Sequence, residues 1–142
     1  FELGTEQDRQ RILTKDHLRA VARALIAYGR RLGGRLPTRD DVVGAAKQDP
    51  YFWVALIGDY VRSTCLHVPG DPQADKLPSS FVFPESAYGL SLSPDGADRS
   101  KVILEERQGI REGGRYAIRL DGSIVWLPSE GARGEVKTDG NG

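Results

Sequence analysis

The chain has 142 residues, and its 20 lysine and arginine residues balance its 20 aspartate and glutamate residues. This length suits one domain with its own apolar core, and the zero net charge excludes an overall attraction to nucleic acid or anionic membranes. A single cysteine excludes an intrachain disulfide and a metal site built from several cysteines. No run of the sequence approaches the roughly 20 apolar residues of a membrane-spanning helix.

The two ends of the chain differ in composition from the rest. Residues 1–5, Phe-Glu-Leu-Gly-Thr, match the translation of a common cloning polylinker, so we expect them to be an expression-vector scar. On this interpretation the natural protein is cut just before Glu6, and the sequence says nothing about a targeting segment ahead of it. Residues 6–128 are expected to form one domain, and residues 129–142, which are polar and glycine-rich, a flexible tail.

The segment from about Glu6 to Leu32 has the pattern of a long amphipathic helix. Its apolar residues recur at steps of three and four, at Leu18, Val21, Leu25, Tyr28 and Leu32. Gly33 and Gly34 are expected to end the helix, because glycine readily takes the left-handed conformation past a helix C-terminus. The opposite face is basic, since residues 6–35 include eight basic and three acidic side chains. The polar part before Leu18 is expected to be an extension that needs a neighbour, or the stump of a longer helix.

Two shorter helices are predicted next. Thr38 is a good N-cap, and Asp41 lies where a capping box places its acid. This helix would carry the apolar residues Val42, Val43, Ala45 and Ala46. Asp49 would cap a further helix over residues 51–61, with Pro50 at its first position. A strand over residues 51–61 is the weaker alternative, because Ala55 and Gly58 disfavour it.

The C-terminal half of the domain is predicted to be strands. Residues 79–84 and 101–106 each have strand character, and two apolar-rich runs over residues 115–127 flank Asp121-Gly122. Asp-Gly favours the two-residue type I′ turn of a hairpin. Such a turn pairs Leu120 with Ser123, Ile118 with Val125 and Tyr116 with Leu127, so these apolar residues share one face. The other face would carry Ala117, Arg119, Ile124 and Trp126.

The order of these elements predicts an α+β fold. One long helix and two short helices come first, and about four antiparallel strands follow. A small sheet with one apolar face needs a cover, and the apolar stripe of the long helix is the matching surface. We therefore expect the long N-terminal helix to pack on a small antiparallel sheet of about four strands.

Three motifs in this order resemble the type IV pilin and type II secretion pseudopilin superfamily. The first is residues 18–28, LRAVARALIAY, followed by residues 34–38, GRLPT. The second is residues 79–83, SSFVF, with residues 102–105, VILE, and the third is residues 113–115, GGR, leading into the hairpin. The likeness is greatest to pilin-like proteins that end in an aliphatic strand, Asp-Gly and a strand with a terminal aromatic residue. Two departures are Val68-Pro69, where the group often has Cys-Pro, and the missing apolar half of the helix.

The resemblance implies a structural subunit of a pilus or a type II secretion pseudopilus, and not an enzyme. Family members anchor in the inner membrane by the N-terminal half of the long helix and pack these helices into a filament core. The expected partners are therefore other pilin or pseudopilin subunits, and the expected location is the bacterial cell envelope, periplasmic or in an extracellular filament. The residues expected to matter for structure and assembly are Leu18, Val21, Leu25, Tyr28, Asp121, Gly122 and Trp126.

Few residues suggest chemistry. Cys65 and His67 are two apart and would share a face of a strand, as a nucleophile and its base can, but a buried thiol beside a surface histidine is favoured. His17 is expected to be solvated. Some pseudopilins bind calcium in a loop, and Asp95 and Asp98 could supply oxygens, although ordinary turn chemistry is favoured and no cofactor is expected.

Two surfaces suggest binding. The basic helix face is compatible with nucleic acid, but a solvated face, or one that meets acidic neighbours in a filament, is favoured. No nucleic-acid partner is therefore expected. Residues 51–53, Tyr-Phe-Trp, are expected to pack in the core or in an interface, and would suit a carbohydrate only if the rings were exposed. The alternative function is an extracytoplasmic ligand-binding module that uses this aromatic cluster or an acidic loop.

Overall fold

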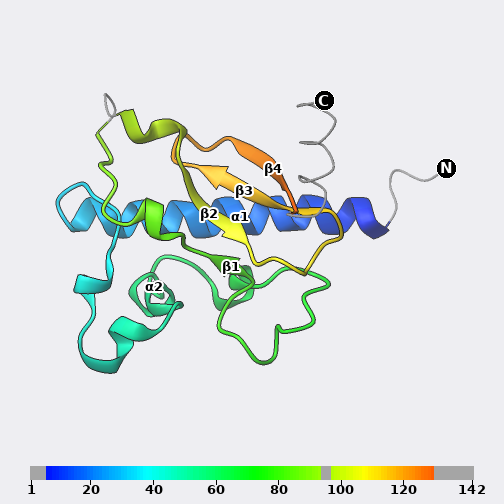
Figure 1. Cartoon of the computed structure of the whole chain (residues 1–142), viewed down its shortest axis with the longest axis horizontal. Coiled ribbons are helices and arrows are strands. Elements are labelled where there is room, and N and C mark those ends of the chain that lie inside the picture. Colours follow the sequence, from blue (N-terminus) through cyan, green and yellow to red (C-terminus); the bar gives the residue numbers. More distant parts are fainter. Residues whose placement is uncertain (1–5, 94–96, 130–142) are drawn as a thin grey trace, which may run out of the picture.

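The computed structural model of the chain describes residues 6–93 and 97–129. One long helix, α1 (Glu6–Arg31), lies across a four-stranded antiparallel sheet (Figure 1). The strands lie in chain order and are β1 (Phe81–Val82), β2 (Val102–Glu106), β3 (Gly114–Arg119) and β4 (Ile124–Pro128). The α+β fold, with a long helix and a small antiparallel sheet, is confirmed. Among the helices of the described residues, none is both long and apolar enough to cross a membrane.

The apolar stripe of α1 forms one wall of the core. Leu18, Val21 and Leu25 are fully buried, and Tyr28 packs against the core from its edge. The helix ends as predicted, because Gly33 has a φ of +97° and the N–H of Gly34 donates to the carbonyl oxygen of Gly29 at 3.0 Å. Together with the Gly33 N–H bonded to the Arg30 carbonyl at 3.4 Å, this is a Schellman motif.

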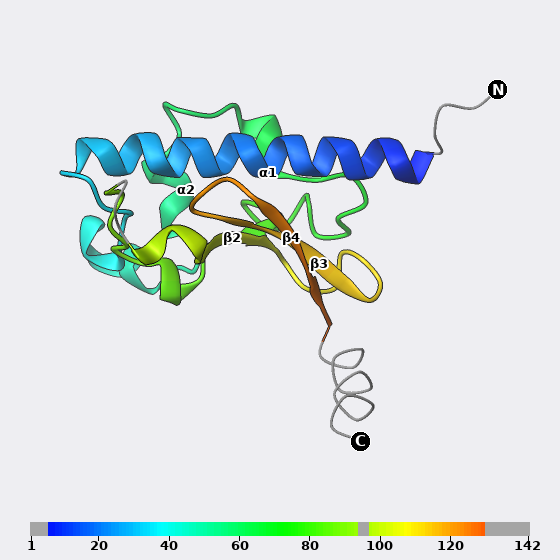
Figure 2. The ribbon, with the colours of Figure 1, turned by 90° about the horizontal axis from the view of Figure 1, so that it is seen from above.

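The N-terminal turns of α1 extend beyond the sheet (Figure 2). Further along the helix, Ile12 is 62% exposed and Leu13 is 43% exposed. Thr14, the next residue, is fully buried. The same helix therefore changes from an exposed segment to a wall of the core within about one turn.

The segment after α1 is less helical than predicted. The capping box of Thr38 and Asp41 is confirmed, but it caps a 3₁₀ turn of only three residues, Arg39–Asp41. A second 3₁₀ turn, Gly44–Gln48, follows, and the positive φ of Gly44, +64°, separates the two. The predicted single helix carrying Val43 is wrong, since a continuous helix cannot include that glycine conformation.

The predicted helix over residues 51–61 is also shortened, to α2 (Phe52–Leu56). The Asp49 carboxylate accepts the N–H of Tyr51 at 2.9 Å and so forms a turn ahead of the helix. Pro50 lies in that turn and outside the helix, which corrects its predicted place at the first helical position. Burial of Phe52, Trp53 and Ile57 fixes this short element to the core.

Of the two single-strand predictions, residues 101–106 are confirmed as β2, whereas residues 79–84 reduce to the two residues of β1. The hydroxyl of Ser79 and the N–H of Ser80 both donate to the Leu66 carbonyl, at 2.7 and 2.8 Å. These bonds tie the chain to the segment around Leu66 instead of extending the ladder, so the strand begins only at Phe81.

The hairpin at Asp121-Gly122 is present, but its predicted turn and register are wrong. Tyr116 pairs with Trp126 and Ile118 with Ile124, one residue away from the predicted pairs. Only Gly122 has a positive φ, +94°, and the Asp121 carboxylate accepts the N–H and the O–H of Ser123 at 2.9 and 2.7 Å. This is a type I turn closed by a glycine bulge, which spares Asp121 the left-handed conformation that type I′ demands.

The shift in register exchanges the faces of β4. Cross-strand partners share a face, so Ile124 and Trp126 join Tyr116 and Ile118 on the side of α1. Val125 and Leu127, predicted for that side, lie on the other face. The expectation that Trp126 and Ile124 belong to a second face, away from the helix, is therefore wrong.

Candidate functional site

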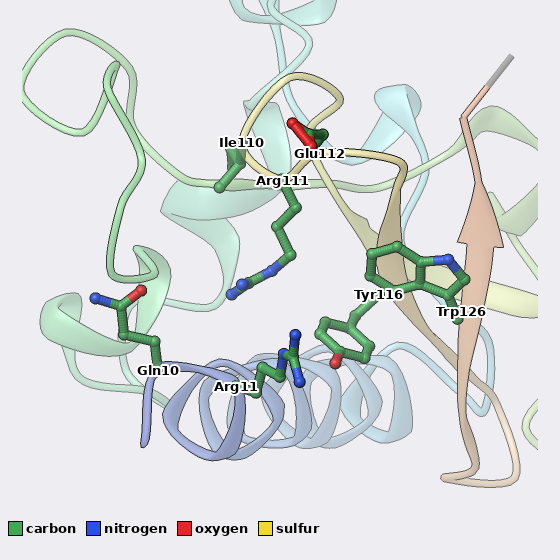
Figure 3. Close-up of a pocket in the computed structure, with 7 residues that line it drawn as sticks. All are labelled: Gln10, Arg11, Ile110, Arg111, Glu112, Tyr116 and Trp126. Carbon is green, nitrogen blue, oxygen red and sulfur yellow. The ribbon is translucent and has the colours of Figure 1, made fainter. Parts of the chain in front are cut away.

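A large groove lies where the N-terminal part of α1 meets β3 and β4 (Figure 3). It has a volume of about 590 Å³ and is lined by Gln10, Arg11, Ile110, Arg111, Glu112, Tyr116 and Trp126. We call it the aromatic groove, because the rings of Tyr116 and Trp126 meet edge to face there, with centroids 5.0 Å apart. The Trp126 side chain is 44% exposed, which is unusual for so large an apolar group.

A buried ion pair lies beneath the aromatic groove. The Glu106 side chain is fully buried, and the Nε of Arg111 is 3.0 Å from each of its carboxylate oxygens. The Tyr116 N–H also donates to Glu106 at 2.8 Å, and Arg111 donates to the hydroxyl of Thr14. Burial raises the pKa of Glu106, although the Tyr116 N–H and Arg111 oppose this. Arg111 therefore links α1 to the sheet, and its positive charge is paired with the buried Glu106 carboxylate.

Two cations lie over the ring of Tyr116. The Lys15 Nζ lies 5.3 Å from the ring centroid, and the Arg111 Cζ lies 5.4 Å from it. Both distances fall within the range of cation–π attraction. Lys15 thus brings a positive charge from α1 to the side of the sheet where Trp126 is exposed.

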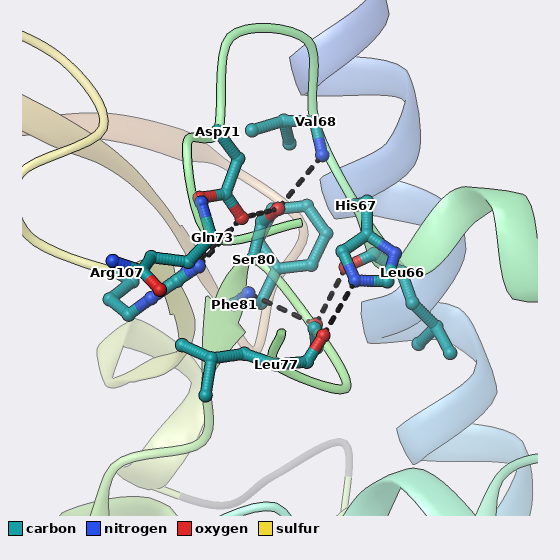
Figure 4. Close-up of polar contacts among 10 residues, drawn as sticks. Leu66, His67, Val68, Asp71, Gln73, Leu77, Ser80, Phe81 and Arg107 are labelled. Atoms are coloured by element: carbon teal, nitrogen blue, oxygen red, sulfur yellow. Dashed lines mark hydrogen bonds and ion pairs between the residues drawn. The ribbon is translucent and has the colours of Figure 1, made fainter. Parts of the chain in front are cut away.

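A second polar cluster anchors the loop between α2 and β1 (Figure 4). The Asp71 side chain is fully buried and pairs with the Arg107 Nη2 at 2.6 Å. It also accepts the hydroxyl of Ser80 at 2.6 Å and the N–H of Gln73 at 2.8 Å, while the Ser80 hydroxyl accepts the N–H of Val68 at 3.0 Å. Because each of these bonds holds one part of the fold to another, the cluster is structural.

The two histidines belong to the same loop attachment. His17 Nδ1 is 2.8 Å from the backbone oxygen of His67, and His67 Nε2 is 2.9 Å from that of Leu77. The prediction of a solvated His17 is therefore wrong. Residues Ser63–Leu66 form a 3₁₀ turn, so Cys65 and His67 do not share a strand face as the nucleophile hypothesis required.

Of the two predicted calcium ligands, the structure describes only Asp98. Asp95 lies outside the described residues. Asp98 accepts the N–H of Ser91 at 3.2 Å and lies 3.7 Å from the Lys101 ammonium. Among residues 6–93 and 97–129, no three His, Cys, Asp or Glu side chains lie close enough to hold a metal ion.

The predicted aromatic cluster lies inside the protein. Phe52 and Trp53 are buried, and Phe52 meets Tyr88 edge to face at a centroid distance of 5.4 Å. Tyr51 is half-buried at the edge of the core. The rings therefore do not form the exposed platform that a carbohydrate would need.

The predicted assembly residues separate into two groups. The helix residues hold the domain together, because Leu18, Val21 and Leu25 are fully buried and Tyr28 meets Tyr60 edge to face at 6.4 Å. The hairpin residues are at the surface: Asp121 and Gly122 form the exposed loop, and Trp126 lines the aromatic groove.

Sequence reasoning missed the residues that organise this groove, Thr14, Glu106 and Arg111. One signal was available: side chains alternate along a strand, so Glu106 must share the buried face of Leu104. A carboxylate on that face requires a buried partner, which Arg111 supplies. The choice of Arg111 depends on the path of the loop after β2, and no pattern in the sequence indicates that path.

Comparisons of this chain with protein-family models, with curated proteins and with solved structures found no match. A functional interpretation therefore starts from the described geometry. That geometry consists of a domain whose buried ion pairs, Glu106–Arg111 and Asp71–Arg107, are structural, a long helix with an exposed N-terminal part, and an exposed aromatic groove.

Proposed function

We propose that this chain is the globular head of a structural subunit of a pilus or type II secretion pseudopilus. The observation that carries the proposal is the division of α1 into a buried part and a projecting part. Leu18 and Leu25 are fully buried in the core, whereas Ile12 and Leu13, on the N-terminal part of the helix, are exposed. The first turns of that part extend beyond the sheet (Figure 2).

A projecting helix with exposed apolar side chains is most stable when neighbouring helices cover it. The buried part holds the head rigidly on this helix through Thr14 and Arg111. In a filament, the projecting part would pack among the helices of other subunits and continue toward the inner membrane. The partners proposed are thus other pilin or pseudopilin subunits, in the bacterial cell envelope.

The alternative, an extracytoplasmic ligand-binding module, has less support. Its aromatic cluster is in the core, since Phe52 is 3% and Trp53 is 0% exposed. Of its acidic loop residues, Asp98 bonds to Ser91 and Lys101 within its own loop.

The coding sequence ahead of Glu6 tests the proposal. A pilin-like subunit requires a short basic leader, a Gly-Phe cleavage site and an apolar run of about 20 residues that joins α1 in one helix. A start methionine directly before Glu6, or a cytoplasmic domain fused there, would contradict it.

A further inference from the structure

The strand β4 forms an open edge of the sheet. It pairs with β3 alone, and in Figure 2 no described segment covers it. The Arg119 N–H donates to the Ser123 carbonyl at 2.9 Å, and the Ser129 N–H donates to the Gly113 carbonyl at 2.9 Å. In an antiparallel ladder such bonded pairs alternate with unbonded ones, so Val125 and Leu127 also point their backbone groups at β3.

The backbone groups of Ile124 and Trp126 consequently point away from the sheet. Within the described residues, neither their N–H groups nor their carbonyls have a hydrogen-bond partner. Pro128 has no N–H, so the edge offers two donors and the three carbonyls of Ile124, Trp126 and Pro128. An edge with free donors and acceptors is a template for an added strand.

The helix that packs on this sheet, α1, carries a row of basic side chains that includes Lys15, Arg23 and Arg30. Residues 15–31 include five basic side chains and one acidic side chain. Arg23 and Arg30 are exposed and form no ion pair with any described residue. Steps of three and four residues place Arg23, Ile26 and Arg30 on one side of the helix.

Contacts at both ends of the hairpin place this row next to β4. Near the C-terminal end of the strand, Lys15 lies over Tyr116, and Arg11 lines the aromatic groove together with Trp126. Near the hairpin loop, Ile26 and Arg30 line a second groove, of about 220 Å³, together with Leu120. Two cations of α1 that no described acid pairs with, Lys15 and Arg30, therefore lie near the two ends of the hairpin.

We propose that the β4 edge binds an extended acidic segment of a partner protein, which joins the sheet as an additional strand. The segment's backbone pairs with the outward groups of Ile124 and Trp126. Side chains of a strand alternate between faces, so carboxylates at every second position point toward α1 and meet Lys15, Arg23 and Arg30. The inference goes beyond the proposed function, because it holds whether or not the chain assembles into filaments.

A peptide fits these observations better than a nucleic acid does. The phosphates of a nucleic acid could pair with the cations, but a nucleic acid cannot form the regular strand hydrogen bonds that the N–H groups of Ile124 and Trp126 offer. An acidic strand uses both features at once: the ladder gives affinity, and the alternating charges give specificity. The net charge of zero gives the whole molecule no general attraction to polyanions.

The test uses a synthetic peptide of alternating glutamate and valine, about eight residues long, the length of a strand. Amide hydrogen exchange of the protein is measured by NMR with and without the peptide. We expect exchange at Ile124 and Trp126 to slow at least several-fold, and exchange at Val125 and Leu127, already bonded to β3, to change little. A peptide of the same sequence with alternate amides N-methylated has the same charge but cannot complete the ladder, and should bind far more weakly.

Two variants separate charge from folding. Arg23→Glu combined with Arg30→Glu should weaken peptide binding roughly tenfold, while Arg62→Glu, at an exposed position in the segment between α2 and β1, should leave it nearly unchanged. No binding of the peptide at millimolar concentration would overturn the inference. Equal binding of the N-methylated peptide, or of single-stranded DNA with unchanged exchange at Ile124 and Trp126, would overturn it too, since the basic row would then attract any polyanion.

Discussion

The two parts of α1 have similar local propensities but opposite environments. Residues 14–28 place a fully buried side chain at nearly every turn, whereas residues 6–13 include two exposed apolar side chains, Ile12 and Leu13. The boundary is Thr14, which Arg111 fastens to the buried carboxylate of Glu106. One helix therefore has two roles: its C-terminal part holds the domain together, and its N-terminal part presents an exposed surface.

Truncation of matched leucines gives the largest contrast between the two parts. Leu25→Ala should lower the free energy of unfolding by about 3 kcal/mol, because it opens a cavity in a closed core. Leu13→Ala should change it by less than about 0.5 kcal/mol, because the side chain is already in contact with water. Urea denaturation of both variants measures the difference, and equal effects would mean that the projecting part is packed in the isolated protein.

Removal of the cation at the boundary should have the next largest effect. Arg111→Met keeps much of the side-chain volume but leaves the Glu106 carboxylate buried without its partner, which should cost about 3 kcal/mol near neutral pH. The double variant with Glu106→Gln should recover part of this loss. Thermal unfolding of the three proteins checks the prediction, and no recovery in the double variant would show that Arg111 acts through packing alone.

Acid should remove the smaller stabilisation that an ion pair after the C-terminal end of α1, Arg35 with Asp41, provides. Arg35 donates to Asp41 at 3.0 Å and holds the pKa of that carboxyl below its ordinary value of 3.8. The folded state thus favours the ionised carboxylate. The stabilisation is therefore complete at pH values above the ordinary pKa of 3.8, and it is lost as the pH falls through the lower pKa of the folded state. Asp41→Asn should cost about 1 kcal/mol at neutral pH, and the gap to the wild type should close in acid.

Burial of Glu106 acts in the opposite direction on the pH profile. Its raised pKa means that the folded state binds the proton more tightly than the unfolded state does. Stability from this group is therefore present below its ordinary pKa of 4.5 and falls as the pH rises toward the folded value. The free energy of unfolding of the wild type and of Glu106→Gln, measured over this pH range, isolates the contribution of Glu106 ionisation. A difference between the two proteins that does not change with pH would contradict the prediction.

Another modest effect is expected at the end of α1. Gly33 has a φ of +97°, and a methyl group added there would meet nothing within 4 Å. Gly33→Ala should therefore cost only about 1 kcal/mol, all of it from the backbone conformation. Calorimetry of this variant beside Gly58→Ala, where φ is not positive, measures that conformational term, and equal stability of the two would contradict it.

The same contrast marks how far the sequence predicted the structure. The stripe from Leu18 to Tyr28, the glycine stop after α1 and the Thr38 capping box follow from local rules, and the structure confirms them. The position of the hairpin at Asp121-Gly122 also follows from local rules, but its register depends on the choice between two turns that accept the same dipeptide. That single step moves Trp126 to the side of α1.

The remaining features depend on tertiary structure. The pairing of Glu106 with Arg111, and of Asp71 with Arg107, joins residues whose approach is set by loop paths. The N-terminal part of α1 lacks an apolar stripe, so its sequence fits equally an extension that packs on a neighbour and the remainder of a longer helix. A local conformation can be predicted from the sequence when one conformation is clearly favoured. When several conformations are close in free energy, contacts elsewhere in the fold decide between them.

Cross-linking of the full-length gene product, with any residues that precede Glu6, in its native cells tests the proposed filament assembly directly. Ile12→Cys and, as control, Val43→Cys are placed in a Cys65→Ser background, since Val43 is 82% exposed at a site away from the projecting turns. The proposed assembly predicts that the Ile12→Cys protein forms cross-linked multimers in the membrane fraction while the Val43→Cys protein stays monomeric. Monomers of both variants would contradict it.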